Sequence, residues 1–94
     1  MLLDAGAEVD VTDLRFGYRP LHFSARKGNA GVNELLVRHG ADLDAQSLRG
    51  KTALHLAVIN GHSAVVTILL KYLARVDICD SYNKLPLQYA EANG

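Results

Sequence analysis

The stretch that decides the fold is TALHLA at residues 52–57, which matches RPLHFS at residues 19–24, one period of 33 residues earlier. Further sets of residues keep the same step. They are Gly17, Gly50 and Asn83; Gly28, Gly61 and Gly94; Leu21, Leu54 and Leu87; and Pro20, Ala53 and Pro86. A fixed period of this length is typical of a solenoid, in which each unit buries its apolar face only against its neighbours. We therefore expect stacked units that offer a surface for binding.

One period contains two helices and a turn. Thr52 can accept the backbone N–H groups that open a helix, and this helix ends near Gly61, where glycine takes a left-handed conformation at low cost. A second helix starts at about Ser63 and carries an apolar stripe so broad that it must be covered on two sides. The segment that follows is polar and turn-rich, with Asn83 at a position of positive φ. The sequence thus predicts an all-α fold of helix-turn-helix units with short β-hairpin tips.

These residues resemble the ankyrin repeat, whose signature Thr-Pro-Leu-His-x-Ala stands here as TALHLA and RPLHFS. The resemblance covers essentially the whole chain, and it implies a curved array whose tips and first helices line a concave face that binds other proteins. In this register residues 1–94 form a single segment, with a partial repeat at 1–10, full repeats at 11–44 and 45–77, and a partial repeat at 78–94. We expect the segment to belong to a longer array, because solenoids generally need about three repeats.

Charge and cysteine content argue against several classes of function. Ten basic and ten acidic side chains cancel, so no net field draws the chain to nucleic acid or to an anionic membrane. The basic residues also form neither a dense run nor the aromatic-lined surface of nucleic-acid modules. No apolar run approaches membrane-spanning length, so we expect no direct membrane insertion. The single cysteine, Cys79, fits a reducing compartment, which favours a cytoplasmic or nuclear location.

The histidines and acidic residues do not predict a metal centre or an active site. His22 and His55 fall on different units, and the resemblance assigns such an imidazole to linking helix starts with adjacent hairpins. Asp42 and Asp44 form a pair on an extended edge with no third ligand nearby. The chain has no nucleophile elbow, phosphate loop or paired cysteines. We therefore expect no metal, no cofactor and no catalysis.

The units depart from the repeat pattern at several places: Arg19 and Leu85 replace the capping threonine, and Gln88 replaces the histidine. The first full unit carries one extra residue in its tip, which should project or bulge. Leu73 stands where Gly6 and Gly40 end their helices, so either it adopts a strained left-handed conformation or the helix runs on. Asn33 occupies the position of Val66, facing the stack, where an unsatisfied amide would cost about 1–3 kcal/mol.

Six of the tip and first-helix positions that the family places on its concave face are basic here, three carry the aromatic rings of Phe16, Tyr18 and Tyr82, and none is acidic. The candidate partner-binding residues are Arg15, Phe16, Tyr18, Arg26, Lys27, Arg49, Lys51, Ile59, Tyr82 and Lys84. They predict a stripe of positive charge with aromatic anchors, suited to an acidic and partly hydrophobic segment of another protein. The alternative is an ordinary surface of solvated lysine and arginine.

The sequence as a whole predicts a protein–protein interaction module without catalytic activity. A second hypothesis is a structural spacer within a larger scaffold, channel or enzyme, whose contacts are made elsewhere. A third is that the array inhibits an enzyme directly by covering its active site.

Overall fold

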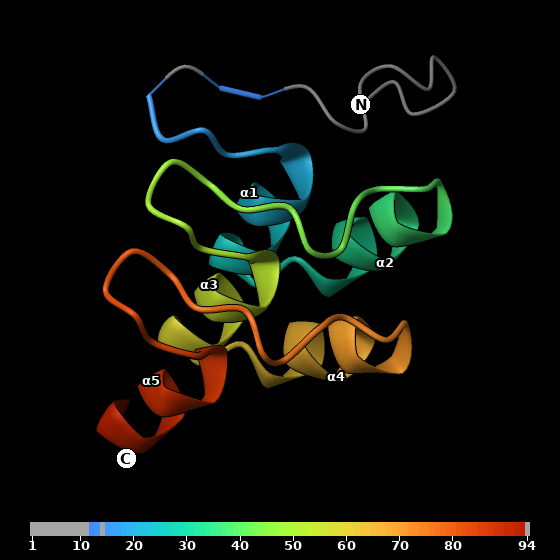
Figure 1. Ribbon diagram of the computed structural model, residues 1–94. Coiled ribbons are helices and arrows are strands. Elements are labelled where there is room, and N and C mark those ends of the chain that lie inside the picture. Colours follow the sequence, from blue (N-terminus) through green and yellow to red (C-terminus); the bar gives the residue numbers. More distant parts are fainter. Residues whose placement is uncertain (1–11, 14, 94) are drawn as a thin grey trace.

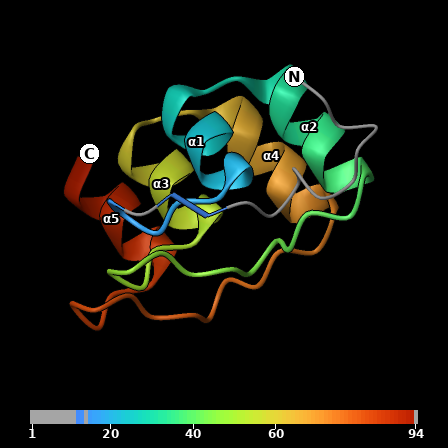
Figure 2. The same cartoon turned by 90° about the horizontal axis from the view of Figure 1, so that it is seen from above.

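The computed structural model describes residues 12–13 and 15–93 (Figure 1). In this part of the chain five helices follow one another: α1 (Pro20–Lys27), α2 (Ala30–Arg38), α3 (Ala53–Ile59), α4 (Ser63–Lys71) and α5 (Pro86–Asn93). The inner helices α1, α3 and α5 stack in one column, and the outer helices α2 and α4 stack in a second (Figure 1). The connecting tips lie together on one side of the helical layer (Figure 2). The all-α helix-turn-helix solenoid is confirmed, while the partial repeat predicted at 1–10 lies outside the described residues.

The inner helices share one way of starting. A side chain in the first turn accepts the backbone N–H of the residue before the helix, namely His22 Nδ1 in α1 (2.9 Å), His55 Nδ1 in α3 (3.1 Å) and Gln88 Oε1 in α5 (2.6 Å). In α3 the hydroxyl of Thr52 also accepts the N–H of His55 at 3.2 Å, which confirms the predicted cap. The same backbone entry therefore recurs in all three helices although the residues differ.

The two histidines also tie each unit to the next. His22 Nε2 lies 3.0 Å from the carbonyl oxygens of both Ala45 and Lys51, and His55 Nε2 lies 3.0 Å from that of Lys84. Because Nδ1 accepts a backbone N–H in each case, Nε2 carries the proton and donates. Burial lowers the pKa of both imidazoles, so they are neutral at neutral pH. The predicted linking role is confirmed.

The tips are turns in which the described residues form no regular strand, so the predicted β-hairpins are reduced to turns that one backbone bond closes at the base. These bonds run from Asp13 N to Tyr18 O (2.8 Å), from Ser47 N to Lys51 O (2.8 Å) and from Asp80 N to Lys84 O (3.0 Å). The first turn is one residue wider than the others, which accommodates the extra residue of that tip. Leu14, inside this turn, lies outside the described residues.

Successive tips are joined through their backbones. The N–H of Leu48 donates to the carbonyl of Phe16 at 3.0 Å, and the N–H of Ser81 donates to that of Arg49 at 2.9 Å. The second contact needs glycine beside it, since Gly50 has φ +77° and an added Cβ would lie 2.9 Å from the nitrogen of Ser81. The tips therefore stack in register with the helices.

Two residues other than glycine adopt left-handed conformations. Asn83 has φ 62°, as its position in the period predicted. Leu73 has φ 71°, so α4 ends at Lys71 and the strained alternative is the one that the chain adopts.

A polar pair interrupts the packing of the first unit. Asn33 is buried, and its Nδ2 donates to Ser24 Oγ at 2.9 Å, while that hydroxyl donates to the carbonyl of Leu21 at 3.0 Å. Asn33 Oδ1 is buried without a hydrogen-bond partner, as expected for an amide facing the stack. Ser24 and Asn33 replace the apolar Ala57 and Val66 of the next unit.

Candidate functional site

The structure places the candidate residues in two groups. The tip group contains Arg15, Phe16, Tyr18, Arg49, Lys51, Tyr82 and Lys84. The helix-end group contains Arg26, Lys27 and Ile59, which lie in the last turns of α1 and α3. Because the tips precede the helices, the two groups are separated by the length of an inner helix, about 12 Å at 1.5 Å per residue.

The first tip is aromatic. The ring centroid of Phe16 lies 5.2 Å from that of Tyr18, which in turn meets the ring of Phe23 edge-on at 5.3 Å. Tyr18 also stacks on His22 at 5.5 Å, and the guanidinium of Arg15 lies 5.8 Å from the Phe16 centroid. We call Phe16, Tyr18 and Phe23 the aromatic tip. Phe23 was missed by sequence reasoning.

A buried carboxylate organises the last tip. The side chain of Asp80 has no exposed surface, and its Oδ2 lies 2.7 Å from Lys51 Nζ and accepts the hydroxyl of Tyr89. Its Oδ1 accepts the backbone N–H groups of Tyr82 (2.9 Å) and Lys84 (3.0 Å). Burial alone would raise the pKa of Asp80, but these donors outweigh it and hold that pKa far below its usual range. Asp80 is therefore ionised and fully engaged.

Lys51 belongs to the same network rather than to the free surface. Its side chain is 15% exposed, and Nζ lies 4.9 Å from the ring centroid of Tyr82 and 5.2 Å from that of Tyr89. Burial would lower the pKa of Lys51, but hydrogen bonds to Asp80 and Tyr89 raise it. The charge of Lys51 is thus compensated within the molecule, and its ammonium group holds the two tyrosines in place.

The remaining cations of the later tips form no ion pair with another described residue. Arg49 Nη1 donates to the hydroxyl of Tyr82 at 2.9 Å, and Lys84 Nζ lies 5.4 Å from the ring centroid of Tyr89. Within the described ranges, the ion pairs are Lys51 with Asp80, Lys71 with Glu34 and Arg75 with Asp77, and none of them includes Arg49 or Lys84. We call Arg49 of the second tip, together with Tyr82 and Lys84 of the third, the cationic tip.

The helix-end group has different surroundings. The carbonyl of Arg26 accepts His62 Nε2 at 3.0 Å, and the ring of His62 covers Gly28 so closely that a Cβ there would lie 2.5 Å from Nδ1. Arg26 and Lys27 are exposed, whereas Ile59 is half-buried. These side chains therefore extend the positive surface along the inner column without joining the tips.

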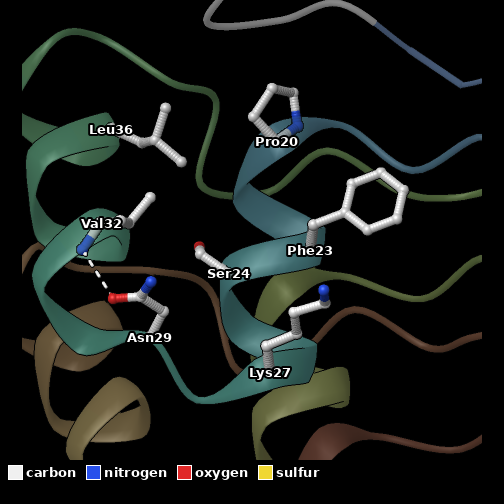
Figure 3. Close-up of a pocket in the computed structure, with 7 residues that line it drawn as sticks. All are labelled: Pro20, Phe23, Ser24, Lys27, Asn29, Val32 and Leu36. Carbon is white, nitrogen blue, oxygen red and sulfur yellow. Dashed lines mark hydrogen bonds between the residues drawn. The ribbon is translucent and has the colours of Figure 1, made fainter. Parts of the chain in front are cut away.

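Two cavities of the described residues lie on the faces where units stack. One of about 350 Å³ opens between α1 and α2 and is lined by Pro20, Phe23, Ser24, Lys27, Asn29, Val32 and Leu36 (Figure 3). The other, of about 240 Å³, lies beside α5 and is lined by Ala57, Val58, Gly61, His62, Ser63, Val66, Leu87 and Ala90. Leu56, Val65 and Leu69, which match Phe23, Val32 and Leu36 one period on, are buried in the stack. We therefore assign both cavities to packing between units.

Neither a metal cluster nor a membrane span is found in the part of the chain that the structure describes. No three side chains of His, Cys, Asp or Glu gather there in a way that could hold an ion. No helix among those residues is both long and apolar enough to cross a bilayer.

The fold and its surface define a helical repeat protein built from stacked helix-turn-helix units. The profile of ankyrin repeats in three copies matches residues 1–80 and 31–94, and the chain belongs to the ankyrin repeat family.

Curated relatives agree with this assignment. The chain is 37% identical over 94 residues to cyclin-dependent kinase 4 inhibitor B of Rattus norvegicus, which covers 99% of the chain and 71% of that protein. It is 32% identical over 92 residues to the B-cell lymphoma 3 protein homolog of Mus musculus, covering 98% of the chain and 20% of that protein. It is 38% identical over 88 residues to the ankyrin repeat domain-containing protein SOWAHB of Homo sapiens, covering 86% of the chain and 11% of that protein.

Proposed function

We propose that the chain is a non-catalytic protein-binding module that holds its partner on the concave face formed by the tips and the inner helices. Ankyrin repeats are generally protein-interaction modules, which supports the general assignment. The observation that carries the specific proposal is the cationic tip, where Arg49 donates to the hydroxyl of the 58%-exposed Tyr82 and Lys84 lies over the ring of Tyr89. The partner is an acidic and partly hydrophobic segment of another protein, and no cofactor is needed.

The chemistry of these tips favours a protein over other ligands. Arginine and tyrosine are enriched among the residues that dominate protein interfaces, because they combine apolar area with directed hydrogen bonds. Among the described residues, a carboxylate approaching Arg49 or Lys84 replaces no ion pair, so its attraction is not offset by an ion pair that must first break. Such contacts weaken as salt shortens the screening length to about 8 Å at physiological ionic strength.

The proposal is tested by affinity capture from lysate with two matched double reversals. One variant carries Arg26→Glu with Arg49→Glu on the concave face. The control carries Arg38→Glu with Lys71→Glu, which changes the net charge equally in the last turns of the outer helices. We expect the concave variant to lose partners that the control and the wild type retain, and moderate salt to elute those partners.

The other outcomes favour the alternatives. Equal capture by both variants would move the contacts to another face of the molecule. Capture of nothing by any of the three proteins would favour the structural spacer, in which the binding contacts belong to other parts of a larger protein.

Direct inhibition of an enzyme is a second candidate function. It is favoured by the similarity to the rat cyclin-dependent kinase 4 inhibitor B, because that match covers 71% of the rat protein. The test is the phosphorylation rate of purified cyclin-dependent kinase 4 with and without the chain. An unchanged rate at saturating chain would rule out this target.

We further place the protein in the cytoplasm or nucleus, because Cys79 is an exposed free thiol that suits a reducing compartment. Imaging of the tagged protein tests this, and secretion into the medium would contradict it.

A further inference from the structure

The concave surface changes its chemistry from one unit to the next. One column of tip positions, each a period apart, holds Phe16, then Arg49, then Tyr82. The column beside it begins with Tyr18 and continues with the two lysines Lys51 and Lys84. The first tip is therefore aromatic in both columns, whereas the two later tips together hold three cations and one tyrosine.

The aromatic tip offers an apolar contact surface. Phe16 is 43% exposed, and its ring centroid lies 5.2 Å from that of Tyr18. The ring centroid of Tyr18 lies 5.3 Å from that of Phe23. Fixed aromatic rings lose little conformational entropy when a partner side chain packs on them. This tip therefore suits an aromatic or branched aliphatic side chain.

The cationic tip is held ready for carboxylates. Asp80 fixes the turn through the backbone N–H groups of Tyr82 and Lys84 and neutralises Lys51. The tyrosine hydroxyl engages one nitrogen of Arg49 at 2.9 Å. Asp80 is thus a positioning residue, and the two remaining cations are presented on a rigid frame.

Resting on the proposed function, we infer that the partner is one extended segment that places an apolar side chain on the aromatic tip and carboxylates on Arg49 and Lys84. The aromatic tip and the cationic tip lie on the same edge of the array, because the tips stack on one side of the helical layer (Figure 2). Their backbones are joined at 3.0 Å (Leu48 to Phe16) and 2.9 Å (Ser81 to Arg49), so a single chain crossing the tips meets them in order.

The spacing of the units sets the spacing within the partner. Packed helices lie about 8–10 Å apart, and an extended chain advances about 3.3 Å per residue, so one unit corresponds to about three partner residues. The carboxylates should therefore follow the apolar side chain after about three and about six positions.

Binding of synthetic peptides, followed by fluorescence anisotropy, tests this arrangement. The probe is a labelled glycine-serine peptide with one tryptophan and with glutamates about three and six positions away, made in both chain directions. Two comparison peptides have the same composition, one with the glutamates directly beside the tryptophan and one with glutamine in place of glutamate. We expect one direction of the spaced peptide to bind at least about tenfold more tightly than either comparison peptide, which corresponds to about 1.4 kcal/mol.

Variants of the protein test the contributions of the aromatic tip and the cationic tip separately. Arg49→Glu with Lys84→Glu should weaken the spaced peptide about tenfold at low salt and remove most of the salt dependence. Phe16→Ser should weaken it severalfold with the salt dependence unchanged. Leu35→Ser on α2 is its matched control, because Leu35 is 42% exposed and Phe16 43%. The control should bind as wild type does, and circular dichroism checks that every variant is folded.

Several results would overturn the inference. Equal affinity for the spaced and contiguous peptides would mean that the surface reads charge alone, and tighter binding of a single-stranded DNA probe would assign the cations to phosphate. If no peptide binds while the charge-reversal capture experiment succeeds, the inferred use of the aromatic tip and the cationic tip fails and the concave protein-binding function stands. Failure of both would reject the two together.

Discussion

The first and middle units share one backbone design but are filled differently. In the middle unit Ala57 and Val66 line an apolar stacking surface, whereas in the first unit Ser24 and Asn33 bond to each other at 2.9 Å and leave one buried oxygen unpaired. In both units, nevertheless, a histidine in the first turn of the inner helix accepts the backbone N–H of the residue before that helix. The helix starts and the links between units therefore maintain the repeat, while the packing between the helices varies.

The largest effect is expected where the two units are alike. His22→Ala and His55→Ala should each lower the free energy of unfolding by about 2–4 kcal/mol, because each leaves a cavity and unpaired backbone groups in the buried stack. Urea denaturation measures this. His39→Ala is the control, since His39 is exposed at the end of α2, and it should cost less than about 0.5 kcal/mol. A loss near the control value for either buried histidine would contradict the linking role.

The next effect is expected where the units differ. Ser24→Ala with Asn33→Val gives the first unit the interior of the middle one, and should raise the free energy of unfolding by about 1–3 kcal/mol because the unpaired amide oxygen is removed. The reverse exchange, Ala57→Ser with Val66→Asn, should lower it by a similar amount. Urea denaturation of both variants makes the comparison, and a destabilised first-unit variant would show that the polar pair is favourable.

A smaller effect concerns the loop after each outer helix. Leu73 has φ 71° and is 83% exposed, so Leu73→Gly relieves backbone strain without losing packing and should stabilise the chain by about 1 kcal/mol. Gly40 stands one period earlier with φ +93°, and a Cβ added there would meet no atom within 4 Å, so Gly40→Leu should destabilise through strain alone, by about 1–2 kcal/mol. Thermal denaturation measures both shifts, and equal melting temperatures for all three proteins would contradict the strain.

The smallest expected effect near neutral pH is the change in stability caused by protonation of His22 and His55. Because burial lowers the pKa of His22 and His55 in the folded state, the unfolded chain binds protons first as the pH falls below its ordinary histidine value of about 6.5. Stability is therefore unaffected above that pH and declines below it. Substituting glutamine for both histidines keeps an acceptor of the kind that Gln88 provides in α5, and should flatten this decline. Urea midpoints of the wild type and the variant, measured from pH 7 to pH 5.5, test this expectation. An equally steep decline in the variant would mean that other groups cause the loss of stability.

The local rules of the fold could be predicted from the sequence. The cap at Thr52 and the left-handed Asn83 follow from a short pattern and its period, the linking histidines follow from the resemblance to the ankyrin repeat, and the structure has all of them. The buried Asn33 was also expected, from its place in the period alone. Among the described residues the predicted β-hairpins do not form regular strands, because only one or two backbone bonds cross each tip.

The candidate site could be predicted only in part. Sequence reasoning placed Lys51 on the stripe of positive charge that meets the partner, whereas the structure joins it at 2.7 Å to Asp80, which also accepts the hydroxyl of Tyr89. That contact brings together a tip, the next tip and an inner helix, so no local pattern contains it. The period did hold one usable signal, since Phe23 and Tyr89 occupy the same helix position in different units.

The backbone bonds between tips have a consequence for how such a protein diversifies. Since Leu48 and Ser81 bond to the main chain of the preceding tip, these two bonds do not depend on which side chains stand at Phe16 and Arg49. The wider first turn shows that even an added residue leaves the array assembled. These backbone joints are thus formed by other atoms than the exposed side chains, so those side chains can change, or be grafted from one unit to another, while the joints are inherited unchanged.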